Sequence, residues 1–383
     1  MNERYIPHQI TPHLWHIQEC LDNPGYMSLI VGEKKALLFD TGYGSGNLSA
    51  VVRRLTNLPL EVVLSHGHFD HACAAWQFDS AWIHPADLDF CLESTSRKVR
   101  APRWGVNTRH KGTPADIPGF RPFYAYINDG CCPLKPLAKD QVFDLGGITA
   151  RVVEMPGHTL GSIGLLLEEE RIFLAEDCAN PTFFLFVEHS GTWENHKENL
   201  RRLLDMPFDT FFIGHRLTRF PKDKLQDFLK AAEQADPAKD RIHVMARVLP
   251  SPVYRSQYGD DEDPESCYML YRRDQVPSSE TIRWEGDNVV VFPADTKEGI
   301  QTVKTCLSEQ KRVFAWVGKK VPAPLRLFKQ EYGSLLQILE KVDQNDPDLI
   351  FCAAQITGDM CQKPLEAVYG NIPQLPFDIR QLF

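Results

Sequence analysis

The run 66–71, which reads His-Gly-His-Phe-Asp-His, places three imidazoles and one carboxylate within six positions. Imidazole and carboxylate are the nitrogen and oxygen ligands that Zn²⁺ prefers. A turn after a strand can aim His66 and His68 to one side, while Asp70 and His71 face a neighbouring point. A solvated loop rarely collects four such groups in so short a run. The run therefore predicts a metal site.

Three further candidate ligands each follow the end of an expected strand. His158 comes after a Pro-Gly pair, Asp177 after Ala-Glu, and His215 after Gly214. In α/β folds, functional groups gather in the loops at strand ends. A lone His is more often a structural residue than a ligand, but with the run 66–71 these three residues complete two metal shells.

The motifs that carry these groups are Asp40-Thr41-Gly42, His66-x-His68-x-Asp70-His71, Pro156-Gly157-His158-Thr159-x-Gly161-Ser162, Asp177 and Gly214-His215. In this order they resemble the motifs of the metallo-β-lactamase-fold superfamily, over residues 10–240. The resemblance implies an αββα sandwich with the site at one edge, between the two sheets. The fold class expected for the chain is α/β, with a smaller α/β region after the sandwich.

The resemblance also implies a role for each candidate ligand. A first metal ion would be bound by His66, His68 and His158. A second ion would be bound by Asp70, His71 and His215, and the two ions would be bridged by Asp177. The expected cofactors are two divalent ions, with Zn favoured and Fe or Mn as alternatives. Asp40 would either support the ligand loops or have a structural role alone.

Two such ions predict a hydrolase. A metal lowers the pKa of bound water from 15.7 to about 7 and so provides hydroxide at neutral pH. Two metals about 3.5–4 Å apart can hold that hydroxide and polarise the substrate together. Asp70 is the expected catalytic residue, because it can steer the nucleophile or protonate a leaving group. Ser65 is interpreted as a turn residue.

Several hydrolases of the superfamily share this ligand set, among them glyoxalase-II-like thioesterases, lactonases, phosphodiesterases and β-lactamases. The sequence shows no export signal, which β-lactamases usually carry, and none of the extra basic domains of the superfamily's nucleases. We therefore expect cleavage of a small-molecule ester, thioester or lactone. A phosphodiesterase and a β-lactamase-type amide hydrolase are the alternatives.

Two other classes compete with a hydrolase. A mononuclear-iron oxidoreductase of the persulfide dioxygenase type uses the same first three histidines with a single Fe. A non-catalytic metal-binding or sensor protein would keep the fold and lose ligands, whereas all seven are present. The sequence departs from the family at Glu176, where Gly is usual, and at 72–75, where a glycine-rich continuation is usual. Neither change removes a ligand.

Alternating apolar runs and turn residues predict the elements that position these groups. The chain is expected to form a domain at 1–245, with an insertion at about 85–140, and a C-terminal α/β region at 246–383, with the boundary within 240–280. Expected strands are 27–31, 36–39, 62–64, 81–83, 148–155, 162–167, 171–175, 210–213, 288–292, 312–317 and 349–353. Expected helices are 47–57, 72–78, 194–204, 222–235, 297–309 and 331–343.

The insertion carries clustered cations and aromatics that could bind an anionic, partly apolar substrate. A solvated surface loop is the other interpretation. The residues are Arg97, Lys98, Arg100, Arg103, Trp104, Arg109, His110, Lys111, Arg121, Phe123, Tyr124 and Tyr126. The C-terminal region could serve in dimerisation, cover the site or act as a second functional domain. Its Cys352 and Cys361 are interpreted as buried thiols rather than a redox pair.

The composition limits the partners. A formal net charge of −9 argues against nucleic acid, which needs clustered Lys and Arg. No apolar stretch is long enough to span a bilayer, so no membrane partner is expected. Ten scattered cysteines are typical of a reduced, soluble cytoplasmic protein. The expected partners are a small-molecule substrate, with an anionic one as an option, and a second copy of the chain in a homo-oligomer.

Overall fold

The computed structural model divides the chain into two compact units, residues 1–229 and 230–383. It describes residues 4–21, 23–96, 98–99, 131–187, 189–237, 239–243, 253–260, 263, 265–272, 275–277, 282–285, 289–292, 294–317 and 320–340. The expected domain boundary within 240–280 stays a prediction. Among the described residues, no helix has both the length and the apolar character needed to cross a lipid bilayer.

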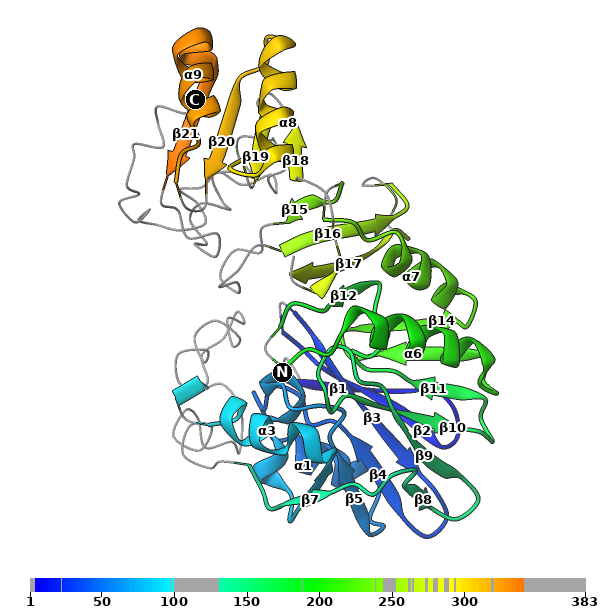
Figure 1. Ribbon diagram of the computed structural model, residues 1–383. Coiled ribbons are helices and arrows are strands. Elements are labelled where there is room, and N and C mark those ends of the chain that lie inside the picture. Colours follow the sequence, from blue (N-terminus) through cyan, green and yellow to red (C-terminus); the bar gives the residue numbers. More distant parts are fainter. Residues whose placement is uncertain are drawn as a thin grey trace. The chain divides into compact units, whose positions relative to one another are not determined.

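The first sheet of the N-terminal unit has seven strands that lie side by side in sequence order (Figure 1). They are β1 (Tyr5–Gln9), β2 (Leu14–Glu19), β3 (Gly25–Val31), β4 (Ala36–Phe39), β5 (Leu60–Val63), β6 (Ala81–Ile83) and β7 (Leu134–Pro136). The first four pair antiparallel, and β4 to β7 pair parallel. The carboxyl ends of β4 and β5 therefore meet at one edge.

The second sheet has six strands in the order β14-β13-β11-β10-β9-β8. They are β8 (Val142–Asp144), β9 (Thr149–Glu154), β10 (Ile163–Leu167), β11 (Ile172–Leu174), β13 (Thr210–Ile213) and β14 (Arg216–Pro221). β9 and β11 each pair antiparallel with β10, and β11 pairs parallel with β13. β9, β11 and β13 thus run in one direction, and their carboxyl ends also share an edge.

β4 is buried on both faces and separates two hydrophobic cores. Leu38 packs in one cluster with Leu48 of helix α1 (Leu48–Leu55). Its neighbours Leu37 and Phe39 pack in the other cluster, with Leu165 of the second sheet. Consecutive side chains of a strand point to opposite faces, so one face meets helices and the other meets the second sheet. Each fully buried Leu or Phe stabilises the fold by about 1.5–3 kcal/mol.

Helices complete the sandwich on its outer sides. α1 and α3 (Leu88–Ser94) contribute Leu48 and Cys91 to the cluster on the outer face of the first sheet. α6 (Trp193–Asp205) buries Leu200 and Leu203. A Thr192–Asn195 capping box fixes the start of α6. The α/β class and the αββα arrangement predicted from the sequence are confirmed.

The expected helix at 72–78 is wrong. The helix in this region, α2, is Phe69–Ala72, and a 3₁₀ turn at Ala75–Gln77 follows it. The Cys73 N–H donates to the carbonyl of Gly42 at 3.0 Å, and Gly42 also pairs with Ala72 as an isolated bridge. This pairing with the chain after β4 prevents a continuous helix, and helical periodicity alone could not reveal it.

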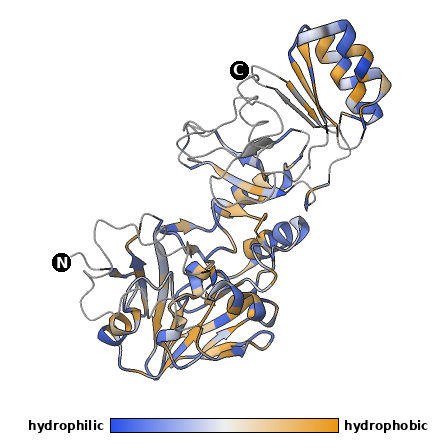
Figure 2. Cartoon of the chain, turned by 90° about the vertical axis from the view of Figure 1, so that its left-hand side faces the viewer, coloured by the Kyte–Doolittle hydropathy of each residue, from blue (hydrophilic) through white to orange (hydrophobic). Residues whose placement is uncertain are grey.

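The second unit contains two groups of strands. β15 (Arg241–His243), β16 (Val253–Tyr258) and β17 (Cys267–Arg272) pair antiparallel. A second sheet has the strand order β18 (Ile282–Glu285), β19 (Val289–Phe292), β20 (Val313–Val317) and β21 (Leu336–Glu340). Along the chain, α8 (Lys297–Ser308) connects the parallel strands β19 and β20, and α9 (Ala323–Tyr332) connects the parallel strands β20 and β21. In Figure 2 both helices carry orange and blue bands, as helices with one buried face do.

The expected helix at 331–343 is also wrong, because 336–340 form the strand β21. α9 ends where Gly333 adopts a positive φ of 57°, a conformation that glycine enters at little cost. β21 pairs parallel with β20, so the run after the glycine completes a sheet edge. The cations and aromatics of the insertion, apart from Lys98, lie outside the described residues, as do strand 349–353 and Cys352 and Cys361.

Candidate metal centre

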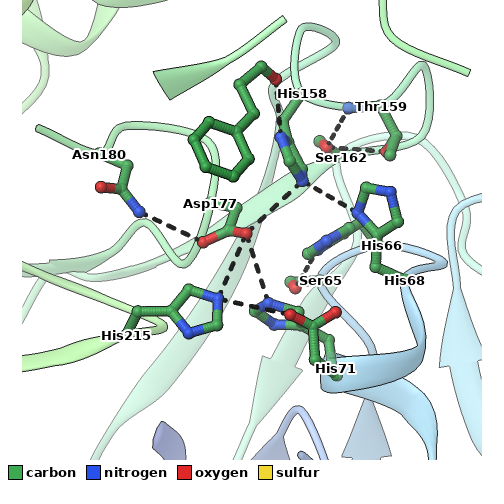
Figure 3. A network of polar contacts seen from close by, with 12 residues as sticks. Ser65, His66, His68, His71, His158, Thr159, Ser162, Asp177, Asn180 and His215 are labelled. Carbon is green, nitrogen blue, oxygen red and sulfur yellow. Dashed lines mark hydrogen bonds and ion pairs between the residues drawn. The ribbon is translucent and has the colours of Figure 1, made fainter. Parts of the chain in front are cut away.

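The candidate ligands lie where strands of the two sheets end. His66 follows β5 and His158 follows β9, while Asp177 and His215 follow β11 and β13. Asp70 and His71 come from the short helix α2, which directly follows His68. Figure 3 shows the imidazoles of His66, His68, His71, His158 and His215 gathered around the carboxylate of Asp177.

Three imidazoles form the first group of candidate ligands, His66, His68 and His158. One ligand atom from each lies within 4.8 Å of the others. The closest pair is His158 Nε2 and His68 Nδ1, at 2.9 Å. His66 and His158 are buried, and His68 is half-buried. All three lie on loops that follow β5 or β9, as the sequence predicted.

A carboxylate and two imidazoles form the second group, Asp70, His71 and His215. Their ligand atoms also lie within 4.8 Å of one another. His215 Nε2 is 3.6 Å from Asp70 Oδ2. His71 is buried, whereas Asp70 and His215 are half-buried. The second group is therefore more exposed to solvent than the first group.

Asp177 lies between the two groups (Figure 3). Its Oδ2 is 3.5 Å from Nε2 of His158 in the first group. The same oxygen is 3.4 Å from Nε2 of His71 and 3.6 Å from Nε2 of His215, both in the second group. One carboxylate oxygen thus faces both groups, which is the position a bridging ligand needs.

Hydrogen bonds orient the imidazoles toward this centre. Carbonyl oxygens only accept, so Nδ1–H of His158 donates to Phe184 O at 2.9 Å, and Nδ1–H of His215 donates to Pro24 O at 3.0 Å. Nδ1 of His71 lies 2.7 Å from Asp40 Oδ2. In the neutral form of each ring, Nε2 then carries no proton and is available as a ligand.

Two buried nitrogens test whether these residues fit a metal. Nε2 of His66 and Nε2 of His71 are buried and have no hydrogen-bond partner in the described part of the chain. A buried polar atom without a partner costs about 1–3 kcal/mol. Both atoms face the cluster, so a divalent cation would satisfy them. The imidazole and carboxylate donors fit such an ion, as the fold implies.

The charges in the site also depend on one another. Burial lowers the pKa of His66 well below its usual range, and the neighbouring His71 lowers it further. Burial opposes the protonation of His71 too, but the carboxylates of Asp40 and Asp177 outweigh it and raise the pKa of His71. Burial would raise the pKa of Asp177, yet His215 and His71 hold it well below its usual range. The carboxylate at the centre is therefore charged.

Asp40 supports both sides of the run 66–71. It is fully buried, and besides His71 it accepts hydrogen bonds from Ser65 N and Ser65 Oγ, both at 2.6 Å. Since the Ser65 hydroxyl donates to Asp40, its oxygen can accept Nδ1–H of His66 at 2.9 Å. Ser65 thus does more than form a turn, and Asp40 has the supporting role that the resemblance left open.

Sequence reasoning assigned no role to two buried acids near the site. Glu19 accepts hydrogen bonds from Tyr43 N at 2.8 Å and Ser45 N at 2.7 Å, and so holds the loop after Asp40. Glu176, with a positive φ of 46°, has no hydrogen-bond partner for either carboxylate oxygen among the described residues, and burial raises its pKa. The sequence signal for the position of Glu176 is the glycine of the Gly214-His215 motif, because the Glu176 side chain packs against it. A Cβ at Gly214 would lie 2.9 Å from its Oε2.

Comparisons with known proteins agree with this architecture. The model of the Metallo-beta-lactamase superfamily matches residues 21–88. The acyl-coenzyme A thioesterase MBLAC2 of Gallus gallus is 28% identical over an alignment of 171 residues, and the match covers 39% of this chain and 55% of that protein. The hydroxyacylglutathione hydrolase GloC of Haemophilus influenzae is 26% identical over 153 residues, 38% of this chain and 61% of that protein.

Among solved structures, a metallo-beta-lactamase from Pontibacter korlensis aligns with 60% of this chain and all of its own, at 16% identity and a TM-score of 0.42. The chain spans about half the length of the curated relatives it matches. The N-terminal unit is thus an α/β sandwich with a cluster of candidate metal ligands. Residues 21–88 and the relatives above make this unit similar to the metallo-beta-lactamase superfamily.

Proposed function

We propose that the N-terminal unit is a metal-dependent hydrolase with two divalent ions, of which Zn is favoured and Fe or Mn are the alternatives. The observation that carries the proposal is the position of Asp177, whose Oδ2 lies 3.4–3.6 Å from imidazoles of both ligand groups. The first group would hold one ion and the second group the other, with Asp177 between them.

The chain's own residues would orient the reaction. When bound, the ions supply a water with a pKa near 7 and a Lewis acid for the substrate oxygen. Asp70 is half-buried on the open side, so its carboxylate can accept a proton from the attacking water and return it to the leaving group. Asp40 and the carbonyls of Pro24 and Phe184 keep three imidazoles in one orientation.

The proposed substrate is a small-molecule ester, thioester or lactone. Two relatives favour a thioester within this class, one named an acyl-coenzyme A thioesterase and the other a hydroxyacylglutathione hydrolase. A phosphodiester or an amide remains an alternative substrate. An anionic substrate, a homo-oligomer and a cytoplasmic location stay predictions.

The second ligand group favours hydrolysis over mononuclear-iron chemistry. A centre with one ion needs only the three imidazoles of the first group. Here Asp70, His71 and His215 also bring their ligand atoms within 4.8 Å of one another. Such a second set is what a two-metal hydrolase requires.

Metal analysis of the purified chain, followed by assays on thioesters, lactones, phosphodiesters and β-lactams, tests the proposal. We expect about two divalent ions per chain and turnover of a thioester or lactone. Asp177→Asn should lose both, while Asp209→Asn, which alters an exposed carboxylate paired with Arg171, should keep both. One Fe per chain with oxygen consumption on a persulfide would contradict the proposal.

A further inference from the structure

Asp87 is a buried acid that no metal ligand touches. It ends the 3₁₀ turn Pro85–Asp87, between β6 and α3, and it is 0% exposed. It has no ion-pair partner among the residues that the structure describes. A carboxylate buried without a cation needs strong hydrogen bonds, so its partners show what it holds.

In the part of the chain that the structure describes, three groups donate hydrogen bonds to the Asp87 carboxylate, and all three belong to the loops of the first ligand group. Gly67 N, between His66 and His68, donates to Oδ2 at 2.8 Å. Thr159 Oγ1, directly after His158, donates to the same oxygen at 2.6 Å. Gly161 N donates to Oδ1 at 2.7 Å. One carboxylate thus joins two loops from different sheets, at positions no more than three residues from their histidines.

Steric contacts make this junction tight. A Cβ at Gly161 would lie 2.6 Å from Asp87 Oδ1 and 2.7 Å from its Cβ, so only glycine allows this approach. The carbonyl of Gly67 accepts a hydrogen bond from Ser94 at the end of α3. Both polar groups of Gly67 are therefore held by the segment 87–94, and the peptide between His66 and His68 has little freedom.

The second ligand group is held in another way. His71 bonds Asp40 directly at 2.7 Å, and His215 bonds Pro24 O at 3.0 Å. Neither contact involves Asp87. A change at Asp87 should therefore reach the first group and leave the second in place.

We propose that Asp87 is a positioning residue that sets the spacing of His66, His68 and His158 and thereby the affinity of the first metal ion. The proposal rests on the metal site of the proposed function. Groups that orient metal ligands typically change metal affinity by about 10–100-fold when replaced. The negative charge of Asp87 would also favour a cation nearby.

Asp87→Asn is the sharpest variant. Each oxygen of Asp87 accepts from a backbone N–H, one from Gly67 and one from Gly161. The asparagine side chain has the same size, but in either orientation its NH₂ group would point at a backbone N–H and one hydrogen bond would be lost. Thr159→Val removes the third hydrogen bond, and Thr159→Ser should restore it. Asp144→Asn is the control, because this exposed acid accepts from Gly146 N in a turn between β8 and β9.

The test is a titration of the metal-free full chain with Co²⁺, followed by absorption spectroscopy and competition with a chelator. His68→Ala and His71→Ala identify which binding event belongs to which group. We expect Asp87→Asn to weaken the first-group event by about 10–100-fold and to leave the second-group event within about twofold. Thr159→Val should weaken the same event less, and Thr159→Ser and Asp144→Asn should match the wild type.

Three results would overturn the inference. They are unchanged binding in both Asp87→Asn and Thr159→Val, an equal loss in both events, and a Thr159→Ser variant that behaves like Thr159→Val. If Asp87→Asn does not fold, the Thr159 pair decides. Failure of the wild type to bind Co²⁺ would instead refute the proposed function and this inference with it. Two wild-type events with an unaffected variant would refute the inference alone.

Discussion

The two ligand groups differ in how far they are enclosed. In the first group His66 and His158 are only 1% and 3% exposed, whereas in the second group only His71, at 2%, is so deeply buried. The side chains of Asp70 and His215 are 17% and 18% exposed. This difference indicates that the first group provides the enclosed floor of the site. The second group is the more exposed to solvent.

The groups also differ in what holds them. Side-chain contacts to Asp40 and Pro24 O hold the imidazoles of the second group. The loops of the first group meet at Asp87 through backbone donors. Asp40 contacts His71 directly and reaches His66 through Ser65, whereas the bonds of Asp87 go to the loops of the first group alone. Substitutions at Asp87 should therefore separate the two metal positions.

The largest effect is expected where the groups meet. Asp177→Ala removes the oxygen that lies 3.4–3.6 Å from three imidazoles, so both groups lose their common ligand. We expect hydrolytic activity to fall by about 10³-fold or more, and metal content to fall with it. Activity assays and metal analysis on the same preparation check this. Wild-type activity in this variant would refute the two-metal arrangement.

Replacement of a single histidine should lower the free energy of unfolding more in the second group, at His71, than in the first group, at His68. His71→Ala leaves the buried Asp40 without its imidazole, at a cost of about 3–5 kcal/mol to the metal-free fold. His68→Ala removes a half-buried ring and should cost about 1 kcal/mol. Urea unfolding of the metal-free variants measures both. Equal losses of unfolding free energy in the two variants would contradict the difference in burial between His71 and His68.

Two buried histidines outside the ligand groups have lowered pKa values, His16 and His196. His16 packs on Tyr26 and Phe212, and burial lowers its pKa to about 4. His196 stacks on Phe183, which contacts His158, and burial lowers its pKa to about 3. Both folded-state pKa values lie below the unfolded value of 6.5. The unfolded chain therefore binds more protons in this window, and stability falls as the pH drops below 6.5.

Between pH 7 and 4.5 each of these histidines should cost the metal-free fold about 2–3 kcal/mol. His16→Gln and His196→Gln should each flatten the pH dependence of the unfolding free energy. His8→Gln serves as the control for loss of an imidazole in β1. Urea unfolding across this pH range measures the slopes. Slopes equal to the wild type in both variants would show that these rings do not titrate on unfolding.

The smallest effect is expected at Ser65. Ser65→Ala removes the hydroxyl that joins Asp40 to His66, but Ser65 N still donates to Asp40 at 2.6 Å. We expect a loss of about 1–2 kcal/mol in stability and about tenfold in first-group metal affinity. Metal titration beside thermal unfolding checks both values. A larger effect on the second group would contradict the assignment, because His66 is the only candidate ligand that bonds this hydroxyl in the described part of the chain.

Residues near one another in the sequence made most of the fold predictable. Strands such as β3, β4 and β13 show apolar runs bounded by turn residues, and the pattern places them within one or two positions. The two wrong helices lie where a distant pairing decides the structure. Gly42 interrupts the helix expected at 72–78, and the parallel partner β20 turns 336–340 into a strand.

The sequence by itself determined which residue types could bind a metal, because His and Asp at strand ends are chemically specific and their spacing is local. Their assembly around Asp177, and the supports at Glu19, Asp40, Ser65 and Asp87, were decided only by the tertiary structure. An acid such as Asp87 carries no local motif, since its partners lie 20 to 74 positions away along the chain. Its role exists only once folding brings two loops to one carboxylate.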